Sequence, residues 1–509
     1  MMHTLSSIRR FLLLLLTAWT PGLLMAQPDF IRDSLDTYMQ RALAQWQVPG
    51  AAVCVIQDGQ VLAQRGYGVC TLGQSAQVDT NTLFLIGSNT KAFTGTALAL
   101  LAQEGKCDLD DRVTRWYPGF RMQDPYLTRE ITLTDILCHR MGLETFQGDF
   151  MYWTSDLSAA QVIEKFGQIT PLYGFRSKWG YTNAGFVVAG ACIEAISGQT
   201  WAEYMQNRFF TPLGMTRTRA LTQGLSAVPN TATPHTWVRG RLEALPFPDL
   251  DNLAPAASIA SSVSDMRHWV SALLDSGRYA GQPVLSFEAI KATRVPVSVL
   301  GRTRNPYVRT HYALYGLGWE LQDYDGWEIV SHTGGVNGFV TSVTLVPEKR
   351  LGIIVLTNTD HNGLYEAAKR DLLDACLGLP FRNYHQRYLT SYQRNQQLTA
   401  RQHQAWQDTV AMNLPPAMPL KMYAGTYSHP IYGKAEVVVQ DNHLILNLEH
   451  HPREGAVLEC LGGNRFRCTY QDPTLGVVVI PFIPGKKTAA GFTLRVADFV
   501  EFTTYDFTR

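Results

Sequence analysis

A serine and a lysine lie three residues apart at the start of a predicted helix. The segment LFLIGSNTKAFTGTALALLAQEGK predicts a short apolar strand, then Gly87 and Ser88, then a helix that ends at Gly105. Residues at this spacing share a helix face, so we expect the Lys91 amine to lie beside the Ser88 hydroxyl. A desolvated lysine can take the hydroxyl proton and make the serine a nucleophile. The same pair can also be a helix-capping serine followed by an exposed lysine.

A tyrosine and an asparagine precede a second, almost wholly apolar helix. In WGYTNAGFVVAGACIEAISG this helix is predicted to end at Gly198. The Tyr181 phenol could carry a proton to a leaving group once a neighbouring cation lowers its pKa, and the Asn183 amide could hold a substrate carbonyl. The alternative is an aromatic packed in the core and an asparagine that caps the helix.

A third motif, VSHTGGVNGF, places His332, Thr333, Gly334 and Gly335 at the end of a predicted strand. Small residues there allow the backbone to lie close to a ligand. The N–H groups of Gly335 and Ser88 are therefore candidates for an oxyanion hole, which would stabilise the negative charge of a tetrahedral intermediate.

The three motifs occur along the chain in the order Ser-x-x-Lys, Tyr-x-Asn and His-Thr-Gly. In this order the chain resembles the superfamily of serine β-lactamases and D-alanyl-D-alanine carboxypeptidases, nearest to its class C branch and the related esterases and D-aminopeptidases. The stretches LTDILCHRMGL, PAASIASSVSDMRHW and YGLGW are also similar to that family, and the resemblance covers residues 30–378.

The resemblance implies a fold and a set of residue roles. The implied fold is an antiparallel sheet of the five-stranded type, flanked by helices and interrupted by a helical insertion. The implied nucleophile, acylated during turnover, is Ser88. The other implied catalytic side chains are Lys91, Tyr181 and His332, and the implied substrate contacts are Asn183, Thr333 and Gly335. Which of the lysine and the tyrosine is the resting base stays open.

His332 bears on the choice of substrate, because class C β-lactamases usually carry lysine there. An imidazole titrates at about pH 6.5, so it would be a weaker and pH-sensitive clamp for a substrate carboxylate. This favours an amide or ester hydrolase, either a D-amino-acid peptidase or carboxypeptidase or an esterase. Gly335 stands where carboxypeptidases often have threonine, which counts against strict D-Ala-D-Ala specificity. A β-lactamase, and a penicillin-binding or cell-wall sensor with little turnover, stay as alternatives.

The composition argues against other functions. The 509 residues include 44 Lys and Arg against 43 Asp and Glu, so a net charge of +1 gives no reason to expect nucleic acid binding. HExxH and CxxC motifs are absent, and His450 and His451 have no partners at ligand spacing, so we expect no metal and no cofactor. The expected partner is a small peptide, ester or β-lactam, and the oligomeric state stays open.

Residues 1–26 have the pattern of a secretory signal peptide. Two arginines precede an apolar run from Phe11 to Trp19, and a Pro-Gly pair and the small residue Ala26 follow it. The run is shorter than the roughly 20 residues that a membrane-spanning helix needs. We therefore expect cleavage near Ala26, export to the periplasm or medium, and no membrane span in the mature chain.

Strand patterns on both sides of a long helical segment predict a single sheet. AAVCVIQ and VLAQRGYGV are joined by the hairpin signal Asp58-Gly59, and WEIVSHT, FVTSVTLV and LGIIVLTN follow far downstream. Residues 30–46 predict an amphipathic helix that covers this sheet. We therefore predict an α/β (α+β) hydrolase domain over residues 27–380.

The C-terminal part of the chain predicts a separate domain. Residues 381–419 are rich in Gln and Arg and end in prolines, which is typical of a linker, with a helical stretch over 396–412. From 420 to 509 short strands dominate, the last of them VEFTTYDF. We predict a small all-β barrel, which resembles the lipocalin-like domain appended to some of these hydrolases.

Overall fold

The structure is a computed structural model that describes residues 28–303, 308–453 and 455–509. The predicted signal peptide lies outside these residues. Within the described ranges, no helix combines the length and the apolar character that a membrane span requires. All eight cysteines lie within the described ranges and are free thiols.

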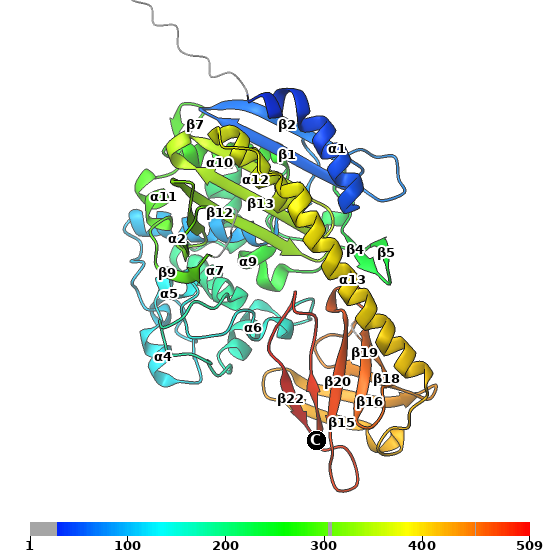
Figure 1. Ribbon diagram of the computed structural model, residues 1–509. Helices are drawn as coiled ribbons and strands as arrows, with labels where there is room; N and C mark the ends of the chain where they lie inside the picture. Colours follow the sequence, from blue (N-terminus) through cyan, green and yellow to red (C-terminus); the bar gives the residue numbers. More distant parts are fainter. Residues whose placement is uncertain (1–27, 304–307, 454) are drawn as a thin grey trace, which may run out of the picture.

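An antiparallel sheet of eight strands forms the centre of the larger part of the molecule (Figure 1). The strand order is β2-β1-β14-β13-β12-β11-β10-β9. The strands are β1 (Gly50–Gln57), β2 (Gln60–Gly68), β9 (Ser298–Arg302), β10 (Tyr312–Tyr315), β11 (Glu320–Tyr324), β12 (Trp327–Val336), β13 (Phe339–Val346) and β14 (Leu351–Thr357). Strand β1 pairs with β14, so the two β regions meet as predicted. The five predicted strands are extended by β9, β10 and β11 beyond β12.

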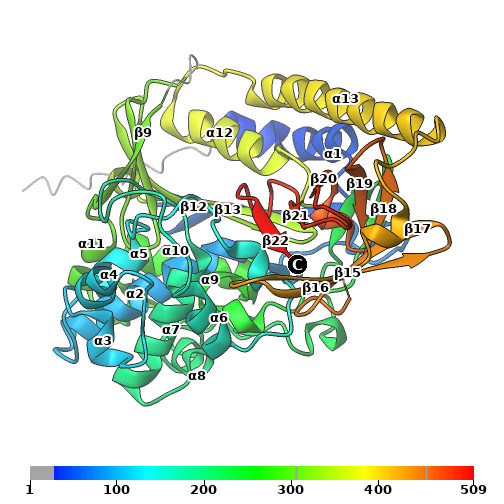
Figure 2. The same ribbon diagram turned by 90° about the horizontal axis from the view of Figure 1, so that it is seen from below.

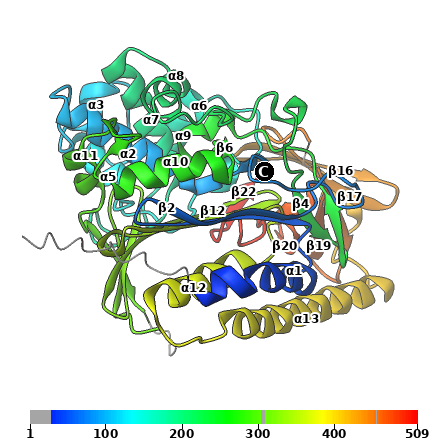
Figure 3. The ribbon, with the colours of Figure 1, turned by 90° about the horizontal axis from the view of Figure 1, so that it is seen from above.

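Helices cover both faces of this sheet, as seen in Figure 3. Helices α1 (Leu35–Trp46) and α12 (Leu364–Leu377) pack on one face, and α2 (Thr90–Gln103), α7 (Asn183–Ser197) and α10 (Val263–Leu274) lie over the other. Every residue of β1 is buried, because layers on both sides exclude water from it. Alternate residues therefore enter separate apolar cores: Val53 and Val55 face α1, and Ala52 and Cys54 face α10.

The predicted helical insertion separates β2 from β9. Its other helices are α3 (Val113–Trp116), α4 (Pro125–Glu130), α5 (Leu133–Leu137), α6 (Ala159–Phe166), α8 (Trp201–Met205), α9 (Ala254–Ala257) and α11 (Phe287–Thr293). Three two-stranded sheets complete it: β3 (Phe84–Leu85) with β6 (Ala260–Ser261), β4 (His235–Val238) with β5 (Arg241–Ala244), and β7 (Arg278–Tyr279) with β8 (Gln282–Pro283).

A single long helix, α13 (Tyr384–Ala411), occupies most of the segment predicted as a linker. It starts earlier than the predicted helical stretch, because Asn383 caps its first turn and glycine and proline are absent until residue 415. Figure 2 shows α13 on the same side of the sheet as α1 and α12, with the C-terminal strands beside it. The boundaries at 380 and 419 stay predictions.

The C-terminal strands form a closed antiparallel barrel, as predicted. They are β15 (Gly425–His429), β16 (Gly433–Gln440), β17 (His443–Leu448), β18 (Ala456–Cys460), β19 (Arg465–Tyr470), β20 (Val477–Ile483), β21 (Gly491–Leu494) and β22 (Tyr505–Thr508). The predicted strand VEFTTYDF is wrong in its first half, since residues 500–503 belong to the loop between β21 and β22. Glu501 turns out of the barrel there and binds backbone N–H groups of the larger domain.

The packing of α2 gives a prediction about stability. Phe93 is fully buried, and its ring stacks on Trp269 of α10 with centroids 4.2 Å apart. We expect Phe93→Ala to lower the free energy of unfolding by about 3–5 kcal/mol, because it leaves a cavity in the core. Urea denaturation followed by tryptophan fluorescence measures this loss. In Phe287→Ala, which truncates a phenylalanine that is 43% exposed, the change should stay within about 0.5 kcal/mol. Equal losses in the two variants would contradict the packing argument.

Candidate active site

Ser88 and Lys91 lie at the entrance to α2. Residues Gly87–Asn89 form a 3-10 turn that runs directly into the helix, so Ser88 is half-buried at the helix N-terminus. Lys91 is completely buried one turn later. Its Nζ lies 3.1 Å from the Ser88 Oγ, so the spacing of the motif predicted the contact correctly.

Three polar groups surround the buried amine of Lys91. Besides Ser88, these are the Asn183 Oδ1 at 2.6 Å and the backbone carbonyl oxygen of Ala256 at 3.0 Å. The Asn183 amide is held in this orientation because its Nδ2 donates to the Asp149 Oδ2 at 2.5 Å. A neutral amine has two hydrogens and one lone pair. If Asn183 and Ala256 take the two hydrogens, the lone pair faces the Ser88 hydroxyl.

The electrostatic surroundings favour the neutral amine. Burial lowers the pKa of Lys91 well below its ordinary value, and the charge of Asp149 acts in the opposite direction. Asp149 is itself buried, which raises its pKa to about 7, although hydrogen bonds from Tyr152 and Asn183 oppose that shift. Asp149 was not among the predicted site residues, because a single acidic residue outside any motif gives no local signal in the sequence.

Tyr181 lies over the amine, with its ring centroid 4.7 Å from the Lys91 Nζ. Burial raises the pKa of Tyr181 well above its ordinary value, and a hydrogen bond with the Ser88 side chain opposes that shift. The expectation that a neighbouring cation lowers the pKa of this phenol is therefore wrong. The desolvation of the phenolate dominates, and the tyrosine holds its proton at neutral pH.

His332 lies on β12 at the edge of the same cluster, with its ring 6.2 Å from the ring of Tyr181. Burial lowers the pKa of His332 to about 3, and the charge of Lys91 acts in the same direction. The imidazole is therefore neutral between pH 5 and 8. The expectation that it clamps a substrate carboxylate as a cation is wrong, because the site is too desolvated to hold that charge.

A chain of hydrogen bonds determines which nitrogen of each histidine carries the proton. The backbone N–H of Thr182 donates to the His139 Nδ1 at 3.0 Å, so the His139 Nε2 carries hydrogen and faces the Tyr315 hydroxyl at 3.3 Å. The Tyr315 hydroxyl lies 2.8 Å from the His332 Nε2, and the His332 Nδ1 lies 2.6 Å from the carbonyl oxygen of Thr333. Since that carbonyl can only accept, every donor in the chain points toward Thr333.

Tyr315 belongs to the stretch YGLGW, but it was not among the predicted site residues. In the folded chain Tyr315 connects His139 to His332, and it is fully buried. Both ring nitrogens of His332 are thus occupied by protein groups. The imidazole is held in one orientation beside Tyr181.

The predicted oxyanion hole is formed by two backbone segments, one at Ser88 and one at Gly335, and these segments lie against each other. Gly87 has a φ of 55°, and a Cβ atom there would lie 2.9 Å from the backbone nitrogen of Gly335. A Cβ atom on Gly334 would lie 1.8 Å from the carbonyl oxygen of Ile86. Glycine is therefore required at residue 334, because any side chain would push β12 away from Ser88. The assignment of the Ser88 and Gly335 N–H groups to the oxyanion hole stays a prediction.

Thr333 lies on the opposite side of β12 from His332, because successive side chains of a strand alternate between faces. Its carbonyl oxygen accepts the hydrogen bond from His332. The substrate contacts expected of Thr333, Asn183 and Gly335 stay predictions. In the structure Asn183 contacts Lys91.

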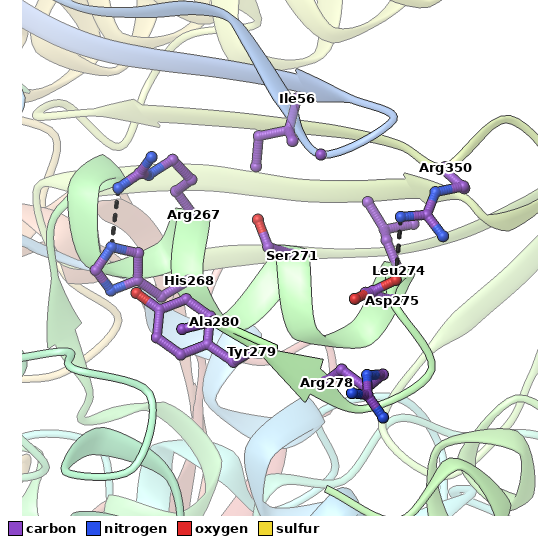
Figure 4. Close-up of a pocket in the computed structure, with 11 residues that line it drawn as sticks. Ile56, Arg267, His268, Ser271, Leu274, Asp275, Arg278, Tyr279, Ala280 and Arg350 are labelled. Carbon is purple, nitrogen blue, oxygen red and sulfur yellow. Dashed lines mark hydrogen bonds and ion pairs between the residues drawn. The ribbon is translucent and has the colours of Figure 1, made fainter. Parts of the chain in front are cut away.

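A separate cavity of about 240 Å³ lies at the far end of the sheet (Figure 4). It is lined by Ile56, Gly59, Arg267, His268, Ser271, Leu274, Asp275, Arg278, Tyr279, Ala280 and Arg350. Arg267 lies against His268 and Arg350 against Asp275. This cavity shares no residue with the cluster around Ser88. Across the described ranges, no three His, Cys, Asp or Glu side chains are grouped so that they could hold a metal ion.

Sequence comparison finds two family matches and several relatives. The Beta-lactamase family model matches residues 35–377, and a Domain of unknown function (DUF3471) matches residues 411–509. An unguisins hydrolase of Aspergillus campestris is 27% identical over 448 residues, which are 83% of this chain and 80% of that protein. Protein flp of Staphylococcus aureus is 26% identical over 337 residues, which are 64% of this chain and 63% of that protein.

Solved structures share the fold at low sequence identity. The octameric penicillin-binding protein homologue from Pyrococcus abyssi has a TM-score of 0.58 at 20% identity, over 93% of this chain and 99% of that chain. A D-stereospecific amidohydrolase from Streptomyces sp. has a TM-score of 0.55 at 21% identity, over 68% of this chain and 98% of that chain. Together with the family match over most of its length, this establishes that the chain belongs to the Beta-lactamase family, within a superfamily of serine hydrolases.

Proposed function

We propose that the protein is an exported serine hydrolase that cleaves an amide or ester bond through an acyl-enzyme on Ser88. The observation that carries this proposal is the 3.1 Å contact between the Ser88 Oγ and a completely buried Lys91 amine. The buried amine favours its neutral form, which is the form able to accept the hydroxyl proton. The proposed export rests on the leader pattern of residues 1–26.

In the proposed mechanism Lys91, and not Tyr181, is the resting base. The Ser88 hydroxyl gives its proton to the lysine lone pair while the oxygen bonds to the substrate carbonyl carbon. The backbone N–H groups of Ser88 and Gly335 receive the negative oxygen. Tyr181, which is protonated at rest, donates its proton to the leaving group and regains one from Lys91. Water then attacks the acyl carbon, and its proton passes through Tyr181 to Lys91. Lys91 returns a proton to the Ser88 oxygen as the acyl group leaves.

The neutral state of His332 bears on the substrate. A neutral imidazole whose two nitrogens are both occupied offers no positive charge to a carboxylate. This supports substrates without a free carboxylate beside the scissile bond, such as esters or internal and blocked amides, over carboxypeptidase or β-lactamase substrates. The name of the relative that spans 83% of this chain, an unguisins hydrolase, also supports hydrolysis. A binding protein with little turnover is disfavoured because Ser88, Lys91 and Tyr181 are all in contact.

Labelling with a fluorophosphonate probe tests the nucleophile. We expect one adduct per chain by intact mass, and its loss in Ser88→Ala, because only the activated hydroxyl reacts. Ser271→Ala, which removes a serine in the separate cavity, should label like the wild type. An unlabelled wild type, or equal labelling of Ser88→Ala, would contradict the enzyme proposal.

The pH dependence tests the base. Activity should rise with pH as Lys91 loses its proton, with a midpoint well below the ordinary lysine pKa. Asp149→Asn removes the charge that raises this pKa, so the rising limb should move to lower pH. The plateau should fall by no more than about tenfold, since a weaker neutral hydrogen bond to Asn183 remains. If the rising part of the pH–activity profile of Asp149→Asn stays in place or moves to higher pH, this would argue against Lys91 as the base.

Paired substrates test the preference for uncharged groups. We expect kcat/KM for a peptide with a blocked C-terminus to exceed that of the same peptide with a free carboxylate at the scissile residue. The ratio should stay constant from pH 5 to 8, because His332 does not titrate in that range. A preference for the free acid that weakens as the pH rises would instead indicate a cationic imidazole clamp.

A further inference from the structure

We propose that the C-terminal barrel completes the active site, with Glu501 as a positioning residue for Asp149 and with Phe499 and Phe502 as a wall for an apolar substrate group. All three residues lie in the loop between β21 and β22. The inference rests on the proposed function, because it assigns these residues to the hydrolysis at Ser88.

Glu501 leaves the barrel and binds the turn that carries Asp149. Its carboxylate accepts the backbone N–H of Gly148 at 2.6 Å and that of Phe150 at 3.0 Å, which are the two neighbours of Asp149. The barrel hydroxyls of Tyr432 and Tyr505 donate to the same carboxylate at 2.6 and 2.5 Å. The glutamate is 1% exposed, so these four donors replace water around it. Only a carboxylate accepts from all four donors.

This contact is linked to the nucleophile through the backbone of the turn and then through hydrogen bonds that begin at Asp149. Asp149 orients the Asn183 amide, and Asn183 accepts from Lys91, which faces Ser88. Displacement of the Asp149 turn would free the amide to rotate. The lysine would then lose one of the two acceptors that keep its lone pair directed at Ser88.

The barrel also forms hydrogen bonds with the turn between β12 and β13, which directly follows Gly335. The Asn337 Nδ2 donates to the Thr474 hydroxyl at 2.9 Å and to the Asp472 carboxylate at 3.2 Å. A third contact joins the His451 Nε2 to the carbonyl oxygen of Phe150 at 2.8 Å. The barrel therefore holds both the turn that carries Asp149 and the turn that follows Gly335.

Aromatic side chains of the same loop face the site. Phe499 lies beside β12, since a Cβ atom on Gly335 would be 3.4 Å from the Phe499 ring. Phe502 is 51% exposed and stacks on Phe146 with centroids 5.6 Å apart, and the Phe146 ring in turn meets Tyr181 at 5.6 Å. An exposed phenylalanine that is connected to Tyr181 through the Phe146 ring offers an apolar group of the substrate a surface to bury.

A double-mutant cycle tests the positioning role. We expect Glu501→Ala to lower kcat by about tenfold or more with KM within about twofold, because orientation and not binding is lost. Glu501→Gln should fall between this variant and the wild type, since an amide keeps one of the two acceptor oxygens. Adding Glu501→Ala to Asp149→Asn should cost much less than it costs alone, because both act through Asn183. Glu436→Ala, which removes an exposed barrel carboxylate, is the control.

The outcomes of the double-mutant cycle distinguish a failure of the Glu501 role from a failure of the proposed function. Full additivity of the two substitutions, or a Glu501→Gln variant with the kcat and pH profile of the wild type, would overturn the positioning role. The isosteric glutamine keeps the test valid if the alanine variant does not fold. Fluorophosphonate labelling of the wild type at Ser88 is checked first. If that labelling is absent, the proposed function has failed, and if it is present, a negative cycle counts against Glu501 alone.

A series of nitrophenyl esters tests the wall. We expect Phe502→Ala to raise KM for a phenylacetyl or decanoyl ester by about fivefold or more, and KM for the acetyl ester by less than about twofold, because only the larger acyl groups reach the wall. Phe381→Ala, which removes an exposed phenylalanine beside α13, is the control. Equal changes for short and long esters, or no change for either, would overturn the assignment of Phe502 to substrate binding.

Discussion

The site depends on the burial of one amine. A lysine without access to water strongly disfavours its charged form, so Lys91 can be both buried and stable only if acceptors meet its hydrogens. Ala256 and Asn183 supply those acceptors, and Asp149 keeps the Asn183 amide from turning round. The same arrangement directs the lone pair toward Ser88. The contacts that stabilise the buried Lys91 amine are therefore the same contacts that orient it toward Ser88.

The fold brings these groups together by packing elements that are distant in the chain. The Ser88 turn lies against β12 so closely that Gly334 has no room for a Cβ atom beside the Ile86 carbonyl. On the opposite side of the site, burial keeps His332 neutral, and the hydrogen-bonded series through Tyr315 holds it in one orientation. In the proposed mechanism backbone N–H groups, and not side-chain cations, offer positive potential to the reacting oxygen.

The barrel has a closer relation to the site than its position at the end of the chain suggests. Its loop between β21 and β22 leaves the strand pattern so that Glu501 can reach the backbone on both sides of Asp149. A buried carboxylate without such donors would be strongly destabilising. The contact therefore holds the two domains in one relative arrangement. Phe502 of the same loop stacks on Phe146, whose ring contacts Tyr181.

Local patterns in the sequence were enough to predict five of the eight strands of the central sheet, the barrel, and the helix starts near Ser88 and Asn183. They were enough because hydrophobic periodicity, turn residues and three-residue spacings act over a few neighbouring positions. The contact between Ser88 and Lys91 is of this kind. Protonation states were not predictable in this way. The depressed pKa of His332 and the raised pKa of Tyr181 follow from desolvation by segments far away in the chain, and the roles of Asp149, Tyr315 and Glu501 exist only through partners that folding brings to them.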